Sequence, residues 1–268
     1  MPLIKTNLEK IDISKLYKKQ IKNSTFKSKS SKDWDKKAQF FNQNAFASSY
    51  TKDFIDKIDL SDCETLLDVG SGPATIALAL ANNLKTVYAL DYSQEMLNLA
   101  QNNAKKLHIN NLVTIHKSWY DSWKDVPKAD IVVASRSMEV KDIKKAINKL
   151  NSKANKKVFI TTKVGGSFID SEILNLLKRD IIPRPDYIYL LNVLHSMGIF
   201  AKVDFIKTRH SRFSSKTQDE FIESLRWSLG NISKKEEKIL RKYFVNRYKD
   251  RSNEEFMTWA FISWDIQK

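Results

Sequence analysis

An apolar segment that runs directly into a Gly-x-Gly turn constrains this chain more than any other feature. Residues 65–69 (Thr-Leu-Leu-Asp-Val) have the composition of a short buried strand, and Gly70, Ser71 and Gly72 follow at once. A helical pattern begins at Thr75. Glycine has no Cβ, so a strand–turn–helix of this kind lets backbone N–H groups approach a bound ligand closely. The segment therefore predicts a ligand-binding turn at the carboxyl end of a first strand.

The rest of the chain alternates short strands with helices. The expected strands cover residues 65–69, 86–90, 113–116, 131–134, 157–162, 202–207 and 256–264, and the expected helices cover 34–58, 75–82, 94–107, 143–150, 171–177, 186–197, 216–227 and 234–248. Strands separated by helices of about ten residues imply a parallel sheet with right-handed crossovers. The last two helices form a hairpin inserted before the final strand, and we expect that strand to run antiparallel at or near the sheet edge.

A carboxylate ends the second expected strand. Asp91 follows Gly70 by 21 residues, and an acid in this place can accept hydrogen bonds from both hydroxyls of an adenosine ribose. The usual dinucleotide fingerprint has a third glycine three residues after the second, where this chain has Thr75. The turn and the acid therefore favour an adenosine-containing ligand other than a nicotinamide dinucleotide.

Two motifs carry a resemblance to a known superfamily. The segments Asp68-Val-Gly70-Ser-Gly72-Pro and Asp91-Tyr-Ser93-Gln-Glu-Met96-Leu97 resemble the first two motifs of class I S-adenosylmethionine (SAM)-dependent methyltransferases. They look most like the small-molecule branch that includes ubiquinone and menaquinone biosynthesis C-methyltransferases. The resemblance covers about residues 34–165. It implies an α/β fold, a Rossmann-like seven-stranded mostly parallel sheet with helices on both faces and inserted cap helices.

The resemblance also implies which residues surround the cofactor. The main chain at Gly70 and Gly72 would face the methionine part of SAM, with Asp68 beneath it. Asp91 would bind the ribose hydroxyls, and Trp119 takes the place of an acid that the family often has near the adenine. The implied cofactor-binding residues are Asp68, Gly70, Ser71, Gly72, Pro73, Asp91, Tyr92, Met96, Ser118, Trp119, Tyr120, Ser135 and Arg136. SAM would be the methyl donor and S-adenosylhomocysteine (SAH) the product.

Several of these assignments have a structural alternative. Tyr92 and Met96 are equally consistent with core packing, and Trp119 is consistent with a core anchor. Asp91 is also placed to cap the helix that starts near Ser93. The family pattern often has glycine where this chain has Ala74, and alanine is small enough that we expect the turn to be kept.

No residue is assigned to catalysis. Methyl transfer from a sulfonium is an in-line displacement with a good leaving group, so the protein's main task is to align the reactants and exclude water. A general base is needed only if the acceptor loses a proton as it reacts. His195, Glu139 and Tyr187 are the candidates. The four histidines show no ligand spacing, and no metal is expected.

The acceptor class is left open by these motifs. The formal net charge is +15, from 46 basic and 31 acidic residues. This charge is consistent with a nucleic-acid partner, or with a Lys/Asn/Ile-rich proteome whose lysines are solvated on helix faces. No Asp/Asn-Pro-Pro-aromatic sequence, the pattern of amino-group methylases of nucleic acids, follows the fourth strand. We therefore expect a small-molecule acceptor, with RNA or protein methylation and non-catalytic SAM binding as alternatives.

Composition also bears on location and domain boundaries. A single cysteine, Cys63, fits a reducing cytoplasm, and no apolar run reaches the roughly 18 residues that span a bilayer, so a cytoplasmic protein is expected. Residues 1–32 are predicted to be a flexible basic segment before a methyltransferase domain over 33–268. Helical insertions are expected around 170–198 and 216–250. The pattern from Trp34, with Phe40 and Phe41, resembles the helix that covers the cofactor in this branch.

Overall fold

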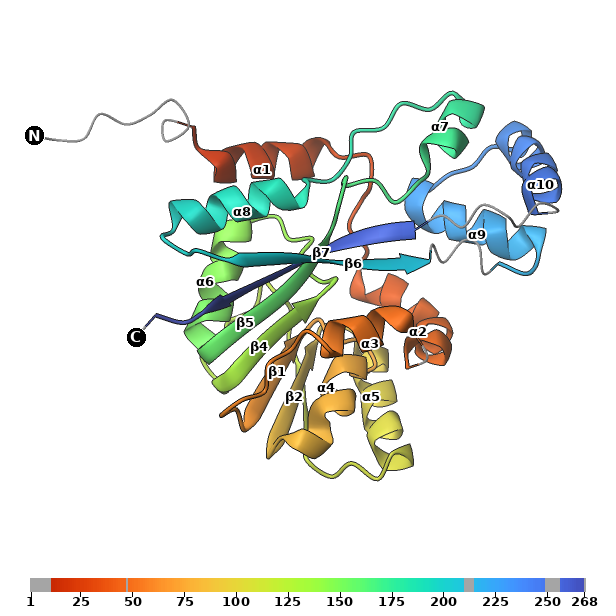
Figure 1. Ribbon diagram of the computed structural model, residues 1–268. Coiled ribbons are helices and arrows are strands. Elements are labelled where there is room, and N and C mark those ends of the chain that lie inside the picture. The colour runs from red at the N-terminus through yellow and green to blue at the C-terminus, as the bar shows by residue number, and fades with distance from the viewer. Residues whose placement is uncertain (1–10, 47, 210–214, 249–255, 268) are drawn as a thin grey trace, which may run out of the picture.

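The computed structural model of the protein describes residues 11–46, 48–209, 215–248 and 256–267. Its centre is a seven-stranded sheet with the strand order β3-β2-β1-β4-β5-β7-β6 (Figure 1). The strands are β1 (Thr65–Val69), β2 (Thr86–Asp91), β3 (Leu112–His116), β4 (Ala129–Ser135), β5 (Ala154–Lys163), β6 (Lys202–Arg209) and β7 (Phe256–Asp265). β1 to β5 run parallel, whereas β7 is antiparallel to both β5 and β6. The prediction of a seven-stranded, mostly parallel sheet is confirmed.

The direction in which the chain adds strands reverses at β1. β1 pairs with β2, beyond which lies β3, and on its other side it pairs with β4, beyond which lies β5. In open α/β sheets, ligands bind outside the carboxyl ends of the strands at such a reversal. The ends of β1, β2 and β4 are consequently the place to look for a site.

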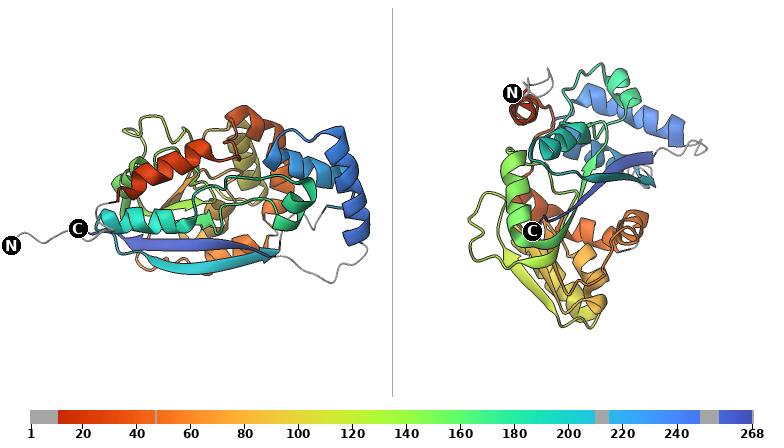
Figure 2. Two further views of the ribbon diagram at one scale, coloured as in Figure 1. Left: turned by 90° about the horizontal axis from the view of Figure 1, so that it is seen from above. Right: turned by 60° about the vertical axis from the view of Figure 1, so that its left-hand side comes forward.

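Helices cover both faces of this sheet (Figures 1 and 2). α3 (Ser49–Ile55), α4 (Thr75–Leu80) with the 3₁₀ turn Ala81–Asn83, and α5 (Gln94–Lys106) pack on one face; α1 (Ile13–Asn23), α6 (Ile143–Lys153) and α8 (Tyr187–Ser196) pack on the other. Successive residues of a strand point to opposite faces. Leu66 therefore joins the core under α3, α4 and α5, and Leu67 joins the core under α6 and α8.

A separate group of helices forms a cap beside the sheet. α7 (Ser171–Leu177), α9 (Gln218–Leu229) and α10 (Lys234–Tyr248) share a third buried cluster, which includes Ile173, Phe221 and Leu240. Figure 1 shows the three together at the right of the molecule. α9 and α10 lie between β6 and β7 in the chain, where the inserted helical hairpin is expected.

The described part of the expected flexible segment is instead ordered. α1 places Ile13, Tyr17 and Ile21 on one stripe against the core under α6 and α8. The Tyr17 hydroxyl donates to the backbone oxygen of Val140 at 3.0 Å, and Phe26 is buried in the cap cluster. The described residues depart from the prediction because three apolar positions among many lysines, Ile13, Tyr17 and Ile21, anchor α1. Residues 1–10 of the same prediction lie outside the described part of the chain.

The single helix expected over 34–58 is two helices. α2 (Ser31–Ala45) begins with a capping box, in which Ser30 accepts from the Asp33 N–H and Asp33 accepts from the Ser30 N–H. α3 follows as a separate helix. Within the described ranges, none of the helices combines the length and the apolar character needed to cross a bilayer.

Candidate functional site

The turn after β1 is built around Gly70. Its φ is +68°, and its N–H donates to the Leu90 backbone oxygen at 2.7 Å. Ser137, just after β4, lies against the same residue and donates its hydroxyl to the Val69 oxygen at 2.6 Å. A Cβ added at Gly70 would be only 2.4 Å from the Ser137 Cβ. Only glycine fits here, for reasons of both backbone conformation and space.

The next residues leave room beside the turn. Gly72 has φ +55°, and a Cβ added to it would meet only the Met96 sulfur, at 3.9 Å. Ala74 has φ +61°, a conformation that costs a non-glycine residue about 1–2 kcal/mol. The turn is kept with alanine at this place, as expected. Close packing therefore does not explain the glycine at position 72. Without a side chain, this residue leaves an open space beside the turn, called the cradle below, which a side chain would fill.

Asp91 ties the end of β2 to this turn. Its carboxylate is 5% exposed and accepts from the Gly72 N–H at 2.8 Å and from the Ser93 N–H at 2.9 Å. Burial raises the pKa of Asp91, and these backbone hydrogen bonds oppose the rise. The cap of α5 is Ser93, whose hydroxyl accepts from the Met96 N–H at 3.1 Å. The helix-cap alternative for Asp91 is thus not what the structure shows.

Asp68 is a buried carboxyl with unused hydrogen-bonding capacity. Asp68 is 1% exposed, and this burial is the main reason that its pKa rises to about 7. The nearby charge of Asp91 raises the pKa further. Within the described residues, three buried side-chain atoms have no hydrogen-bond partner: Asp68 Oδ2, Ser71 Oγ and Arg184 Nε. Such atoms are normally paired, so two of them on one turn indicate a place where a ligand or ordered water belongs.

Helix α2 covers the start of α5. Trp34 packs on Met96 and Ala38, and its ring centroid is 5.3 Å from that of Trp227 on α9. The Ser93 hydroxyl donates to Asp35 at 2.5 Å. Tyr92 also takes part in this layer, because its hydroxyl donates to the Lys29 oxygen at 2.9 Å, and burial raises its pKa. The side chain of Phe41 lies outside the described part, and Phe40 is exposed.

The segment after β3 contributes unequally. The Trp119 indole N–H donates to the Ser137 oxygen at 3.1 Å, and the ring lies against Trp123. Trp119 therefore lies beside Ser137, which touches the glycine turn, and also packs on the core. Ser118 holds a local turn by accepting from the Tyr120 N–H at 3.1 Å, while Tyr120 is 67% exposed.

Ser135 and Arg136 end β4 beside two residues that the sequence did not single out. The Tyr50 hydroxyl lies 2.8 Å from the Ser135 hydroxyl and 2.6 Å from the Thr161 hydroxyl. Arg136 has φ +56°, and its guanidinium lies 4.1 Å from the centre of the Tyr50 ring. Tyr50 and Thr161 are 111 residues apart in the chain, so no local pattern could have joined them.

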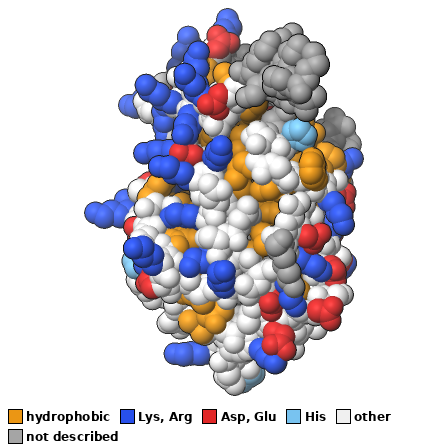
Figure 3. All heavy atoms as spheres, turned by 90° about the vertical axis from the view of Figure 1, so that its left-hand side faces the viewer, with side chains coloured by type: hydrophobic (Ala, Val, Ile, Leu, Met, Phe, Trp, Pro, Cys, Tyr) orange, Lys and Arg blue, Asp and Glu red, His pale blue; other side chains and the backbone are white. Residues whose placement is uncertain are grey.

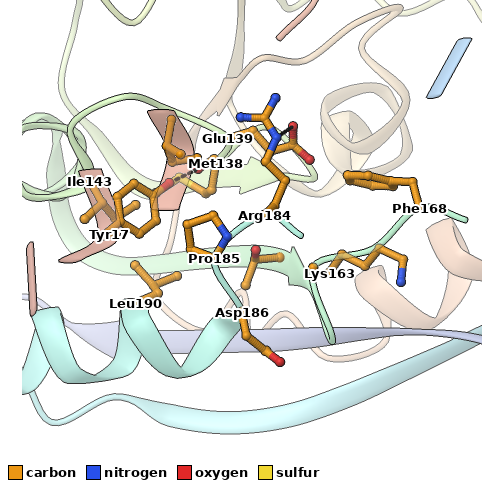
Figure 4. Close-up of a pocket in the computed structure, with 13 residues that line it drawn as sticks. Tyr17, Met138, Glu139, Ile143, Lys163, Phe168, Arg184, Pro185, Asp186 and Leu190 are labelled. Atoms are coloured by element: carbon orange, nitrogen blue, oxygen red, sulfur yellow. Dashed lines mark hydrogen bonds and ion pairs between the residues drawn. The ribbon is translucent and has the colours of Figure 1, made fainter. Parts of the chain in front are cut away.

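A pocket opens at the carboxyl ends of β4 and β5, close to the loop that follows Ser135 and Arg136 (Figure 4). The residues that line it are Tyr17, Ile21, Met138, Glu139, Ile143, Thr162, Lys163, Gly166, Phe168, Arg184, Pro185, Asp186 and Leu190. Met138 and Glu139 directly follow Ser137, which touches the glycine turn. Glu139 is the one sequence-derived base candidate among these lining residues. His195 instead contacts Phe200, and Tyr187 contacts Phe205.

The turn suits the cofactor that the motifs imply. The orphaned Asp68 oxygen offers an acceptor for an ammonium group, and the open side of Gly72 offers room for a chain to lie against the backbone. Asp91 retains lone pairs beyond its two backbone hydrogen bonds, and these are available to hydroxyls. The donor and acceptor set thus fits the amino acid and ribose parts of SAM.

Known proteins resemble this chain in sequence and in fold. A model of the methyltransferase domain family matches residues 60–238. An uncharacterized protein of Haemophilus influenzae is 38% identical over 241 residues, which cover 88% of this chain and 89% of that protein. A putative methyltransferase from Bacillus halodurans superposes with a TM-score of 0.56 at 12% identity, covering 81% of this chain and 99% of that one. Magnesium protoporphyrin IX methyltransferase from Synechocystis, solved with bound SAH, superposes with a TM-score of 0.50 at 11% identity, covering 84% and 83%.

The family match covers well over half of the chain, and it includes β1, the glycine turn and Asp91. The superposed structures share the sheet on which these residues stand. The protein therefore belongs to the methyltransferase domain family and is a class I SAM-dependent methyltransferase.

Proposed function

We propose that the glycine turn, Asp68 and Asp91 hold SAM, and that the pocket of Glu139 receives a small-molecule acceptor. The observation that carries this proposal is the adjacency of the two places. Ser137 touches Gly70 on one side, and Met138 and Glu139 line the pocket on the other. Because Ser137 and Glu139 are only two residues apart in the loop after β4, a methyl donor bound at the turn and an acceptor bound in the pocket would lie side by side.

The remaining residues of the implied cofactor set are proposed to act around this core. Ser71 and Pro73 continue the turn, and Tyr92, Met96 and Trp119 provide the apolar walls near it. Ser135 and Arg136 stand between the turn and Tyr50. Tyr120 and Ser118 lie at the outer rim, where Tyr120 is largely exposed.

SAM, when bound, would supply a methyl group on a sulfonium, which an acceptor lone pair can displace in line from sulfur. The protein's own residues bind and orient. Asp68 and Asp91 fix the cofactor at two separated polar groups, so that its methyl position is defined. Trp34 and Met96 exclude water from the same layer.

A small acceptor is supported by the form of the pocket. It lies between α1, α8 and the loop after β5, and its walls include Tyr17, Ile143 and Leu190 as well as charged groups. Walls that come from several separate segments of the chain suit a small molecule better than a polymer. The likeness to quinone-biosynthesis enzymes rests on the cofactor motifs alone, and the charges of Arg184 and Glu139 do not add to it.

The cofactor site is tested by Gly72→Ala, with Gly198→Ala as the matched control. Both glycines have positive φ, +55° and +76°, but only Gly72 borders the proposed cradle, and nothing lies within 4 Å of a Cβ at Gly198. Both variants should lose similar stability, about 1 kcal/mol, from left-handed strain. Gly72→Ala should weaken SAM about tenfold or more in calorimetric titration, and Gly198→Ala should not. Equal SAM affinity in the two variants would refute the placement of the cofactor.

The acceptor class is tested separately by SAH formation. The protein is incubated with SAM and a cell extract divided by filtration into small molecules and macromolecules. SAH should form with the small-molecule fraction. Formation only with the macromolecules would favour RNA or protein methylation, and formation with neither would favour a SAM-binding protein without catalysis.

A further inference from the structure

We propose that the pocket beside the glycine turn recognises an acceptor with an anionic end, a carboxylate or a phosphate, which Arg184 binds. This inference deepens the proposed function and rests on it, because the pocket matters for methylation only if the methyl donor lies at the neighbouring turn. The shared chemistry of the two groups is a planar or tetrahedral oxyanion that accepts two hydrogen bonds from one guanidinium.

Arg184 is buried without being fully paired. Its side chain is 5% exposed, and Nε makes no hydrogen bond. Nη2 donates one long hydrogen bond, 3.3 Å, to the Ser28 hydroxyl. A guanidinium carries five donors, and a buried donor without a hydrogen-bond acceptor is unfavourable, so such donors are normally paired. A buried arginine with this much unused capacity is therefore a recognition group for an oxyanion.

The nearest carboxylate, that of Glu139, makes no hydrogen bond to Arg184 Nε. Arg184 and Glu139 form an ion pair in which Glu139 Oε2 lies 3.5 Å from Arg184 Nε. This distance is too long for a charged hydrogen bond, and the Glu139 side chain is 42% exposed, so the pair offsets the charge of Arg184 without using its Nε donor. Asp186 is engaged elsewhere, because it accepts from the Gly165 N–H at 3.0 Å and from the Tyr187 N–H at 2.6 Å. Figure 4 shows its carboxylate pointing away from the guanidinium. Arg184 Nε thus has no hydrogen-bond acceptor among the described residues, and a ligand that enters the pocket would supply one.

The other cation of the pocket has partners of its own. The Lys163 ammonium donates to the Val164 oxygen at 3.2 Å and lies 5.9 Å from the centre of the Phe168 ring. In Figure 4 it points away from Arg184. Arg184 is therefore the primary anion donor, and Lys163 serves as the control for unspecific positive charge.

The backbone holds Arg184 in this position through Gly166. The Arg184 N–H donates to the Gly166 oxygen at 2.8 Å, and a Cβ added at Gly166 would lie 2.0 Å from the Arg184 oxygen. Gly165 has the same left-handed backbone, φ +79°, but nothing lies within 4 Å of its added Cβ. The two glycines are thus a matched pair in which only one supports Arg184.

Glu139 completes the arrangement at the end nearer the glycine turn. Burial raises the pKa of Glu139 and the charge of Arg184 lowers it. If the acceptor atom carries a proton, its lone pair forms the bond to the methyl carbon, the carbon–sulfur electrons stay on sulfur as SAH, and the proton passes to the Glu139 carboxylate. The exposed edge of Glu139 then returns the proton to solvent.

The surrounding surface favours an anionic ligand. α1 and α6 both contribute to the pocket wall, through Tyr17 and Ile143, and their outer faces carry exposed lysines: Lys15, Lys18, Lys19, Lys22, Lys144 and Lys145. In Figure 3, which faces the left-hand side of Figure 1, lysine and arginine side chains gather along one edge of the molecule. A positive potential near a pocket raises the local concentration of anions.

The test uses the full chain saturated with SAH, so that the cofactor place is filled. Benzoate, phenyl phosphate and the neutral benzamide are titrated calorimetrically; the aryl ring suits the apolar wall, and inorganic phosphate serves as a fourth probe. At least one of the two aryl anions should bind about tenfold or more tightly than benzamide. The aryl anion that binds more tightly shows whether the anionic end of the acceptor is a carboxylate or a phosphate.

Variants then show which residues cause the preference for the anions over benzamide. Arg184→Gln and Gly166→Ala should abolish it, while Lys163→Gln and Gly165→Ala should keep it. Glu139→Gln removes a neighbouring negative charge at a partly exposed position, so it should tighten the anions about threefold to tenfold. This last variant decides the matter even if Arg184→Gln does not fold, since a merely structural Arg184–Glu139 pair would lower stability without tightening any anion.

Three results would overturn the proposal: no preference for anions over benzamide, loss of the preference with Lys163→Gln alone, or displacement of the probes by mixed tRNA at micromolar concentration, which would indicate a polymer acceptor. SAH binding, recorded first in the same titrations, separates these failures from failure of the proposed function. A protein that binds SAH normally but shows no anion preference loses this inference only.

Discussion

Asp91 links the backbone of the glycine turn to the proposed ribose site. Replacement by alanine would leave the buried N–H groups of Gly72 and Ser93 without a partner, at about 1–3 kcal/mol each. Asp91→Asn is the better probe, because the amide oxygen can still accept from one of these two N–H groups while the charge is removed. It should weaken SAM by about 2–3 kcal/mol, or about 30- to 150-fold, in calorimetric titration.

The control for Asp91→Asn is thermal unfolding without ligand. A change of only a few degrees is expected, since most of the packing is retained. If the variant unfolds at much lower temperature but binds SAM normally when folded, Asp91 stabilises the turn and does not bind the cofactor.

Asp68 makes the stability of the protein depend on pH. Its pKa is about 7 in the folded chain, against an ordinary value of 3.8 for an aspartate side chain, so the folded state holds the proton more tightly. The free energy of unfolding should therefore fall as pH rises from about 4 to 7, by at most about 4 kcal/mol. Asp68→Asn should remove this fall and make the protein more stable than wild type at pH 8. Urea unfolding at several pH values measures the free energy of unfolding of both proteins.

The same carboxyl should couple SAM binding to proton release. An ammonium group beside Asp68 favours the ionised form, so SAM should bind more tightly at pH 8 than at pH 6 in the wild type and not in Asp68→Asn. A pH dependence that is unchanged in Asp68→Asn would show that another group is responsible.

At the scale of elements, local patterns predicted most of the sheet and the glycine turn. Strand and turn are specified by neighbours in sequence: Gly70 and Asp91 each stand where a strand ends, and the Gly-x-Gly pattern itself signals close approach. α1 was missed because its apolar stripe of Ile13, Tyr17 and Ile21 is diluted by lysines, and its stability comes from packing on α6 and α8.

The pocket could not be predicted for a different reason. Arg184, Glu139 and Tyr17 come from three distant parts of the chain and meet only in the folded protein. The sequence around Arg184 shows two prolines, Pro183 and Pro185, between two expected helices, which signals a break in the chain and not a site. Sequence patterns identify the cofactor turn because it is contiguous, whereas an acceptor pocket is assembled from loops.

At the scale of the whole molecule, the charge of +15 is distributed over several surfaces. Exposed lysines occur on α1, for example Lys15 and Lys19, and also at the far end of α5, at Lys105 and Lys106. Lysine side chains that are solvated on separate helices attract a polyanion without forming a site for it. Mixed tRNA should therefore bind weakly, with a dissociation constant above about 10 μM at roughly 150 mM salt, and without sequence preference.

Fluorescence anisotropy at several salt concentrations measures this binding, and two double variants test whether the charge is diffuse. Lys15→Gln with Lys19→Gln, and Lys105→Gln with Lys106→Gln, each remove two charges from exposed positions. If the attraction is general, the two variants should weaken tRNA binding alike, and each should reduce the salt slope by at most about 2. Micromolar affinity with sequence preference, lost only in the α1 variant, would instead identify α1 as part of a nucleic-acid interface. That outcome would favour RNA as the acceptor, because α1 also lines the pocket through Tyr17 and Ile21.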